Sequence, residues 1–173
     1  NRPSKIKTFK KDNVGLTKNI CDFIIKYNLN KTIVFSSTIQ VNNNTDYGAS
    51  KKKCELYLQK LKKNNKSKVI MLRLPNVYGK WSKPNYNSVV STFCYNISRN
   101  KKIKITNPNK TINLLYIDDL VDELINIKNK KAVKDKIFNK FKFTQQLTAK
   151  KLSNIIYNFE KNRNTLFFKH LFL

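Results

Sequence analysis

Apolar residues recur every three or four positions in five segments of the chain, and short apolar runs lie between these segments. Apolar positions at this spacing form one face of a helix. The pattern predicts helices over residues 12–27, 47–62, 88–99, 118–128 and 147–161. Asp12 or Asn13 is placed to cap the first helix, and Thr144 or Thr148 the last.

The apolar runs between the helices predict strands at residues 32–37, 68–74, 102–105 and 114–117, with a polar loop at 75–87. Runs such as 32–37 and 68–74 are typical of strands buried on both faces of a parallel sheet. Alternating helices and strands predict an α/β fold. A doubly wound nucleotide-binding sheet normally opens with a glycine-rich turn, but the three glycines here are isolated. The chain is therefore either another α/β fold or the carboxy-terminal half of a doubly wound, Rossmann-like domain.

Composition places the chain among basic proteins with enough apolar residues for a core. It has 173 residues, 40% of them hydrophobic, and a formal net charge of +26. Such a charge first indicates a polyanion partner. However, the lysines are spread along the whole chain, and aromatic residues are not interleaved with them as in a base-stacking surface. A coding bias toward Lys and Asn is the preferred interpretation, so no nucleic-acid partner is expected.

The three cysteines lie far apart and form no metal-binding spacing, which predicts reduced thiols, no metal site and a cytoplasmic protein. The first residues lack the apolar region of a signal peptide. No apolar run approaches the roughly 20 residues that a membrane span needs. The only histidine, His170, lies in a short apolar tail, so a Ser-His-Asp triad is not expected.

The most informative segment is "YGASK", in which Tyr47 and Lys51 are four residues apart. On a helix the two side chains share one face. A phenol has a pKa of about 10, and a neighbouring cation lowers it toward neutral pH, where the phenol can exchange protons. Ser36, Ser37 and Thr38 end the preceding strand, where open α/β sheets place their sites. The alternative is a chance pairing in a lysine-rich chain, with the hydroxyls serving only as turn formers.

"IVFSST" followed by "YGASK" resembles the extended short-chain dehydrogenase/reductase family, and "DNVGLT", "RLPNVYG" and "YIDDLV" agree with it in order and spacing. The resemblance implies that Tyr47 is the general acid/base and that Thr38 is the catalytic hydroxyl. It also implies that Lys51 lowers the tyrosine pKa and holds the nicotinamide ribose, while Asn13 supports the site and its proton relay. The implied cofactor is NADPH or NADH, and its expected contacts are Tyr47, Lys51, Ser36, Leu74 and Pro75.

The segments "SSTIQ", "RLPNVYGKWSKPNYNSVVSTFCYNI" and "NFEKNRNTL" are similar to a narrower group of this family. Its members use NADPH to reduce a UDP-linked 4-keto-6-deoxy N-acetyl amino sugar on the route to UDP-N-acetyl-L-fucosamine, in capsular polysaccharide synthesis. The resemblance spans about residues 1–166. The residues expected to bind the UDP-sugar are Thr38, Arg73, Asn76, Lys80, Trp81, Tyr86, Asn87 and Ser88. For Trp81 and Tyr86, plain packing is an equal alternative.

The family's amino-terminal glycine-rich turn and its carboxy-terminal cupin domain have no counterpart in this sequence, so we expect the middle part of a longer enzyme. Residues 1–75 would be the back half of the Rossmann sheet, and residues 76–173 mostly the substrate-binding lobe. The isolated chain is expected to bind the cofactor weakly or not at all, and to be inactive. Family members commonly dimerise through the Tyr-Lys helix, which predicts a homodimer with interface in helices 12–27 and 47–62.

Three alternatives to a reductase remain. An epimerase or dehydratase of the same superfamily would use the same Tyr and Lys. Dehydratases typically carry Asp-Glu after the catalytic threonine, whereas Ile39-Gln40 stands here, which favours reduction. A polyanion-binding protein would bind in a strongly salt-dependent manner. A catalytically dead fragment is the third alternative, and the retained Asn13, Thr38, Tyr47 and Lys51 mean that any decay is recent.

Overall fold

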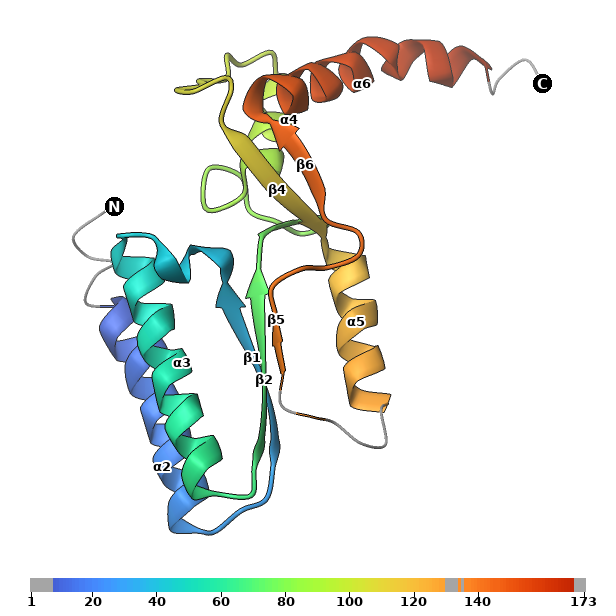
Figure 1. Ribbon diagram of the computed structural model, residues 1–173. Helices are drawn as coiled ribbons and strands as arrows, with labels where there is room; N and C mark the ends of the chain where they lie inside the picture. Colours follow the sequence, from blue (N-terminus) through green and yellow to red (C-terminus); the bar gives the residue numbers. More distant parts are fainter. Residues whose placement is uncertain (1–7, 130–133, 135, 170–173) are drawn as a thin grey trace. The chain divides into compact units, whose positions relative to one another are not determined.

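The computed structural model describes residues 8–129, 134 and 136–169, with side chains up to Arg163 except that of Lys10. His170 therefore lies outside the described residues. The chain divides into two compact units (Figure 1). The first comprises Asn1–Pro75 and Leu124–Lys142, and the second comprises Asn76–Glu123 and Phe143–Leu173. The sequence-based division assigned residues 76–173 mostly to the second part, and in the structure Leu124–Lys142 cluster with the first unit.

The first unit is built on a parallel sheet of three strands in the order β1-β2-β5. These are β1 (Thr32–Thr38), β2 (Lys68–Leu74) and β5 (Lys136–Phe138). Strands β1 and β2 pair along their whole length, from Thr32 opposite Lys68 to Thr38 opposite Leu74. Their carboxyl ends are therefore level. This parallel sheet with its helices confirms the predicted α/β class.

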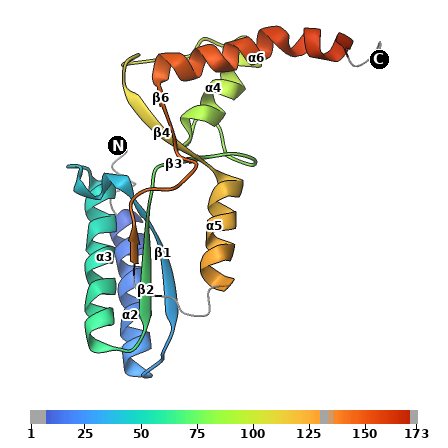
Figure 2. The same cartoon turned by 45° about the vertical axis from the view of Figure 1, so that its right-hand side comes forward.

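Two helices, α2 (Leu16–Lys26) and α3 (Asp46–Asn64), lie side by side against this sheet (Figure 2). Their apolar faces and the sheet form one core, made of Cys21, Ile24, Leu58, Leu61, Val69 and Met71. Burial of these side chains provides the main favourable free energy that holds helices and sheet together. Thr45 caps α3 by accepting a hydrogen bond from the backbone N–H of Gly48 at 3.1 Å.

The predicted start of the first helix was wrong. The chain is already helical in a π-helical turn, η1 (Phe9–Gly15), which continues directly into α2. Asp12 and Asn13 lie inside this turn and cap nothing. The side chain of Asn13 instead donates a hydrogen bond to Ser50 of α3, a partner that no local pattern could indicate.

The expectation that both main strands are buried on both faces holds only for β2, whose residues Val69–Leu72 are all buried. Strand β1 exposes alternate residues, and Val34 keeps 40% of its surface accessible. The reason is position: β2 pairs on both sides, while β1 is the outer strand of the described sheet.

The second unit has a small mixed sheet in the order β3-β4-β6. Strand β3 (Asn76–Tyr78) runs parallel to β4 (Thr111–Tyr116), and β6 (Gln145–Thr148) is antiparallel to β4. Helices α4 (Val89–Ile97) and α6 (Ala149–Lys169) pack on it around Phe93, Ile97, Leu114, Leu152 and Ile156. Helix α5 (Ile117–Asn129) follows β4 without a loop and crosses the boundary between the units.

Several short elements of the second unit differ from the predictions. Residues 102–105 form no strand, although Ile103 and Ile105 pack on the core as an irregular segment. Strand β3 lies within the predicted loop, and residues 147–148 belong to β6 rather than to the last helix. Thr148 does cap that helix, because its Oγ1 accepts a hydrogen bond from Lys151 N at 3.1 Å.

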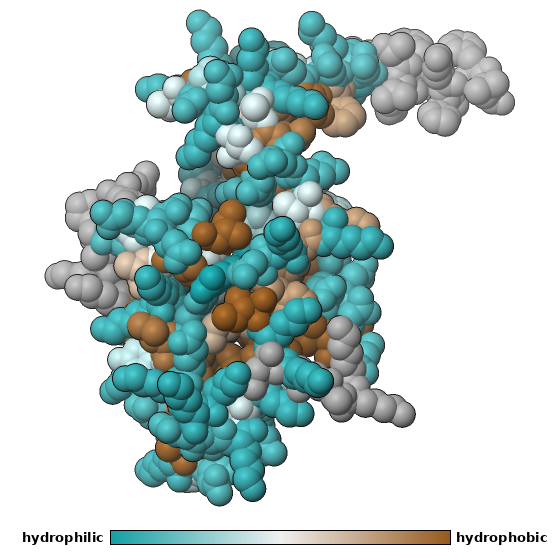
Figure 3. Space-filling view, viewed as in Figure 1, coloured by the Kyte–Doolittle hydropathy of each residue, from teal (hydrophilic) through white to brown (hydrophobic). Residues whose placement is uncertain are grey.

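Apolar side chains interrupt a mostly polar surface (Figure 3). One group follows α2 at intervals of four, three and four residues, and therefore shares one helix face. Its members are Leu16, Ile20, Phe23 and Tyr27, each between 45% and 59% exposed. We call this group the α2 stripe.

Candidate functional site

The candidate site of the first unit begins at the carboxyl end of β1. Ser37 and Thr38 are buried there, whereas Ser36 is exposed. Thr38 Oγ1 accepts a hydrogen bond from Gln40 N at 3.2 Å, which begins the short helix η2 (Ile39–Asn42). Because the threonine oxygen acts as acceptor in this contact, its own proton remains available for donation to another oxygen.

Tyr47 and Lys51 lie in the first turns of α3 and are both partly buried. Lys51 Nζ donates a hydrogen bond to the backbone carbonyl of Ser36 at 2.9 Å. The same ammonium lies 4.9 Å from the ring centre of Phe35 and 6.0 Å from that of Tyr47. The structure thus brings the cation and the phenol together with Ser36, at the end of the sheet where the sequence places the site.

The protonation of this pair differs from expectation. Burial raises the pKa of Tyr47 above its usual value, and burial lowers the pKa of Lys51. The predicted lowering of the phenol pKa by Lys51 is therefore wrong for this structure. The ammonium is directed at the Ser36 carbonyl, and burial, which disfavours the charged phenolate, is the cause of the raised pKa of Tyr47. Tyr47 is consequently a neutral phenol near pH 7, which is the form that can give up a proton.

Asn13 connects the π-helical turn to the Tyr-Lys helix. Its Nδ2 donates to Ser50 Oγ at 3.3 Å, and that hydroxyl donates to the carbonyl of Tyr47 at 2.8 Å. The backbone carbonyl of Asn13 accepts from Thr17 Oγ1 and Cys54 Sγ. Asn13 therefore supports the backbone at Tyr47, while its predicted part in a proton relay stays a prediction.

A buried ion pair beside the site escaped sequence reasoning. Glu55, only 3% exposed, accepts two hydrogen bonds from Arg73, Nε to Oε1 at 3.0 Å and Nη2 to Oε2 at 2.7 Å. Ser37 Oγ donates to the same carboxylate at 2.6 Å. Burial alone would raise the pKa of Glu55, but these hydrogen bonds outweigh it and hold the pKa below its ordinary value. The network joins β1, α3 and the end of β2.

One signal in the sequence could have indicated Glu55. It is the only acidic residue between Lys51 and Lys63, in a segment rich in lysine, and it follows Lys51 by four residues on the same helix face. Arg73 was expected to contact the substrate. The structure directs two of its nitrogens to Glu55, so a substrate role for Arg73 stays a prediction.

The end of β2 completes this part of the site. Leu74 lies opposite Thr38 in the parallel pair, and Pro75 follows it. An ammonium, a phenol and a hydroxyl at the carboxyl ends of parallel strands suit the hydroxyl groups of a nucleotide ribose, because open α/β sheets bind nucleotides at this edge. The residues present thus fit the ribose side of a dinucleotide cofactor.

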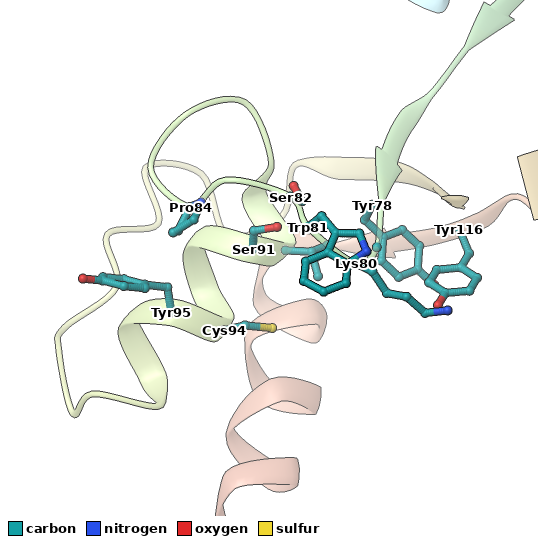
Figure 4. Close-up of a pocket in the computed structure, with 11 residues that line it drawn as sticks. Tyr78, Lys80, Trp81, Ser82, Pro84, Ser91, Cys94, Tyr95 and Tyr116 are labelled. Carbon is teal, nitrogen blue, oxygen red and sulfur yellow. The ribbon is translucent and has the colours of Figure 1, made fainter. Parts of the chain in front are cut away.

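The second unit contains a pocket of its own, with a volume of about 460 Å³ (Figure 4). Trp81, Lys80, Tyr78 and Tyr116 gather at one end, and Ser91, Cys94 and Tyr95 project from α4. Lys80 Nζ forms an ion pair with Asp118 Oδ2 at 3.0 Å. Trp81 is 99% exposed, so the alternative that it packs in the protein interior is excluded.

Four other residues expected to bind substrate, Asn76, Tyr86, Asn87 and Ser88, also belong to the second unit but do not line this pocket. Asn76 Nδ2 donates to the carbonyl of Asn113 at 3.1 Å, and Ser88 caps α4 by accepting from Ser91 N at 3.3 Å. Tyr86 is 62% exposed, and Asn87 is also exposed in the same loop. Their roles toward a substrate stay predictions.

Within residues 8–129, 134 and 136–169, no group of three or more His, Cys, Asp or Glu side chains is arranged to hold a metal ion. Cys21, Cys54 and Cys94 are free thiols. In the same described ranges, no helix has the length and apolar character needed to cross a membrane.

Comparison with known proteins finds a family, a curated protein and solved structures that are similar to this chain. Residues 2–139 match the model of the NAD dependent epimerase/dehydratase family. The chain is 36% identical over 166 residues to the UDP-2-acetamido-2,6-beta-L-arabino-hexul-4-ose reductase of Pseudomonas aeruginosa, covering 96% of this chain and 44% of the relative. The crystal structure of CapF, a capsular polysaccharide assembling protein of Staphylococcus aureus, is similar with a TM-score of 0.73 and 31% identity, over 85% of this chain and 41% of CapF.

A UDP-glucuronic acid 4-epimerase from Bacillus cereus, solved with NAD, has a TM-score of 0.77 at 18% identity and shows the fold alone. The chain spans less than half of the length of the reductase and of CapF. The family match covers most of the chain and includes Tyr47, Lys51 and the strands around them. On this basis the chain belongs to the NAD dependent epimerase/dehydratase family.

Proposed function

We propose that this chain carries the catalytic Tyr-Lys part of an NAD(P)-dependent reductase that acts on a UDP-linked 4-keto-6-deoxy N-acetyl amino sugar. The observation that supports this proposal most directly is the hydrogen bond of Lys51 to the Ser36 carbonyl. It keeps a cation and a neutral phenol together at the carboxyl end of the sheet. The identity to a relative named as a hexul-4-ose reductase supports the substrate class. The likeness to CapF supports a place in capsular polysaccharide synthesis, and within it we propose the route to UDP-N-acetyl-L-fucosamine.

The cofactor of the proposed reaction is NADPH or NADH. When bound, it supplies the hydride that reduces the carbonyl carbon. Lys51 and Tyr47 would hold the nicotinamide ribose through the ammonium and the phenol. Ser36, Leu74 and Pro75 would line the cofactor at the ends of β1 and β2.

Tyr47 serves as the general acid of the proposed reaction. As the C4 carbonyl becomes an alkoxide, the phenol donates its proton to that oxygen, so the sugar gains one hydride and one proton. The raised pKa of Tyr47 keeps the phenol protonated at neutral pH, which suits reduction rather than the reverse oxidation. Thr38 donates its free hydroxyl proton to the same oxygen and stabilises the developing charge.

Residues of the second unit would bind the UDP-sugar. Lys80 supplies a cation for the diphosphate, and its ion pair with Asp118 is exposed and therefore weak enough to rearrange. Trp81 would offer its free ring, and Asn76, Tyr86, Asn87 and Ser88 would contribute polar groups around it. Thr38 of the first unit would contact the sugar at its C4 oxygen.

The proposed enzyme is a cytoplasmic homodimer. The α2 stripe supports the dimer, because exposed large apolar groups that share a helix face usually mark an interaction site. Leu56 of the neighbouring helix α3 is also 51% exposed. The three free thiols support a reducing compartment.

Mass spectrometry of the product tests the proposed reaction. The chain is incubated with NADPH and the UDP-linked 4-keto sugar, and a product two mass units heavier is expected. The isolated chain is expected to be inactive, so a method that detects small amounts of product is needed to find residual activity. An epimerase would give a product of unchanged mass. Tyr47→Phe should abolish the heavier product with the fold retained, and its formation by Tyr47→Phe at the wild-type rate would contradict the proposal.

A further inference from the structure

We propose that the indole of Trp81 is the stacking surface for the uracil ring of the nucleotide sugar. The inference rests on the proposed function, and it concerns one contact within the second unit. It gives a functional reason for two unfavourable features of Trp81, namely the exposure of its side chain and its left-handed backbone conformation. The resemblance places Trp81 only among the residues expected to bind the UDP-sugar, and it does not say which part of the nucleotide sugar the indole contacts.

Trp81 has two features that folding alone does not explain. The residue is 99% exposed, although burial of an aromatic ring is strongly favourable. Its φ angle is +64°, in the left-handed region that a bulky residue rarely adopts. Strained residues of this kind persist where the surrounding structure determines them, and they are concentrated at functional sites.

The surrounding loop does fix the Trp81 backbone. Two residues before it, Gly79 has a φ of +151°, and a Cβ there would lie 2.3 Å from Ile117 Cγ2, so only glycine fits. On the far side, Asn85 N donates to Thr92 Oγ1 of α4 at 2.9 Å. The indole is therefore presented by a turn that is anchored on both sides.

The pocket next to the indole suits a flat aromatic ligand. Tyr78 and Tyr116, whose ring centres are 5.4 Å apart, stand beside Trp81 at the same end of the pocket (Figure 4). Its volume of about 460 Å³ lies in the range of roughly 300–1,000 Å³ that ligand pockets occupy. Aromatic side chains bind bases by stacking on their π-faces, and Lys80 places a cation beside the indole for the adjoining phosphates.

Trp81 is the only tryptophan of the chain, so its fluorescence reports this contact directly. The full chain is titrated with UDP, with inorganic pyrophosphate and with N-acetylglucosamine. Stacking on the base predicts saturable quenching by UDP and none by pyrophosphate or the free sugar. Quenching by N-acetylglucosamine without quenching by UDP would overturn the inference in favour of a sugar contact.

Three variants separate stacking from folding, with UDP affinity measured by calorimetry. Trp81→Leu should bind UDP roughly tenfold more weakly, in line with the loss of one base stack. Trp81→Gly should lose affinity equally while its melting temperature does not fall, because glycine accepts the left-handed backbone. Phe159→Leu, an exposed aromatic on α6 outside the pocket, should leave both quantities unchanged.

The outcomes distinguish the inference from the proposed function. If UDP binds but neither Trp81 fluorescence nor the affinity of Trp81→Leu responds, the stacking contact is refuted and the reductase proposal stands. If the correctly folded chain does not bind UDP at all, both fail. A fall in the melting temperature of Trp81→Gly would also count against the inference, since it would show that the indole stabilises the fold.

Discussion

At the scale of single residues, the site combines a neutral phenol, a partly buried ammonium and a buried hydroxyl. Burial acts on the two titrating groups in opposite directions, raising the pKa of Tyr47 and lowering that of Lys51. Each shift favours the neutral form of its group. The hydrogen bond of Lys51 to the Ser36 carbonyl favours the ammonium form at neutral pH. The residue chemistry is therefore suited to proton donation by Tyr47.

The rate of reduction should follow this protonation. We expect kcat to stay constant through neutral pH and to fall only in strongly alkaline solution, as Tyr47 loses its proton. The raised pKa of Tyr47 moves this fall to higher pH than for a free phenol. The KM for the cofactor should increase earlier, because the lowered pKa of Lys51 removes its charge at lower pH than in an exposed lysine. A kcat that rises with pH between 7 and 9 would contradict this assignment.

The buried carboxylate of Glu55 should matter to stability. Glu55→Gln leaves Arg73 without its counter-charge, which we expect to cost on the order of 3 kcal/mol in the free energy of unfolding. Urea unfolding at pH 7 measures this loss. Asp22→Asn breaks an exposed pair with Lys18 on α2, and as a matched control it should cost about 0.5 kcal/mol or less. Equal effects of the two variants would refute the structural role of the buried pair.

In the wild type, acid should remove the stabilisation that the Glu55 carboxylate provides. The folded-state pKa of Glu55 lies below its unfolded value, so its stabilisation is present above the unfolded pKa of about 4.3 and is lost as pH falls through the folded value. The unfolding free energy of Glu55→Gln should therefore depend less on pH below about pH 4. An identical dependence of the unfolding free energy on pH in the variant and the wild type would argue against this contribution of Glu55.

At the scale of elements, long periodic segments were predicted well and short ones were not. Helix α3 and strand β2 carry their signal within their own residues. Strands β3, β5 and β6 have only three or four residues each, and they exist because distant strands pair with them. The π-helical turn at Asn13 likewise depends on contacts with α3. Local sequence contains none of these partners.

Gly48 tests the packing of the Tyr-Lys helix. A Cβ on this residue would lie 2.3 Å from the carbonyl oxygen of Gln40, so Gly48→Ala should push α3 away from η2 and lower stability by roughly 1–3 kcal/mol. Thermal unfolding distinguishes the two possible effects. A change from glycine to alanine inside a helix normally stabilises the helix, whereas the close approach of Gln40 predicts a lower melting temperature. Lys53→Ala, on the exposed side of α3, is the control and should be nearly neutral. A higher melting temperature for Gly48→Ala would contradict the close approach.

At the scale of the whole molecule, motif spacing was enough to predict where Tyr47, Lys51 and Ser36 meet, because helix geometry and strand ends fix these positions. It was not enough for Glu55 and Arg73, which are 18 residues apart and meet only through the packing of α3 on the sheet. The division into two units also depends on the return of β5 to the first sheet. A three-residue strand contains too little pattern to predict that return.

The α2 stripe predicts the assembly state. We expect a dimer in sedimentation velocity, and a monomer when Ile20→Gln and Phe23→Gln are combined, because the double change removes apolar contact area without adding charge. Phe159→Gln, which changes an even more exposed aromatic residue on α6, should remain dimeric. A monomeric wild-type chain, or a dimer that tolerates both substitutions, would contradict an interface at this stripe.

The most direct test of the account is whether the Tyr-Lys pair binds a nicotinamide cofactor. Saturation-transfer NMR with NADPH detects even weak binding by the 173-residue chain. We predict signals from the nicotinamide ribose with the wild type, their loss in Lys51→Met, and their retention in Lys52→Met, whose side chain is exposed. Equal ribose signals from the wild type and Lys51→Met would contradict the assignment of Lys51, and with it the proposed site.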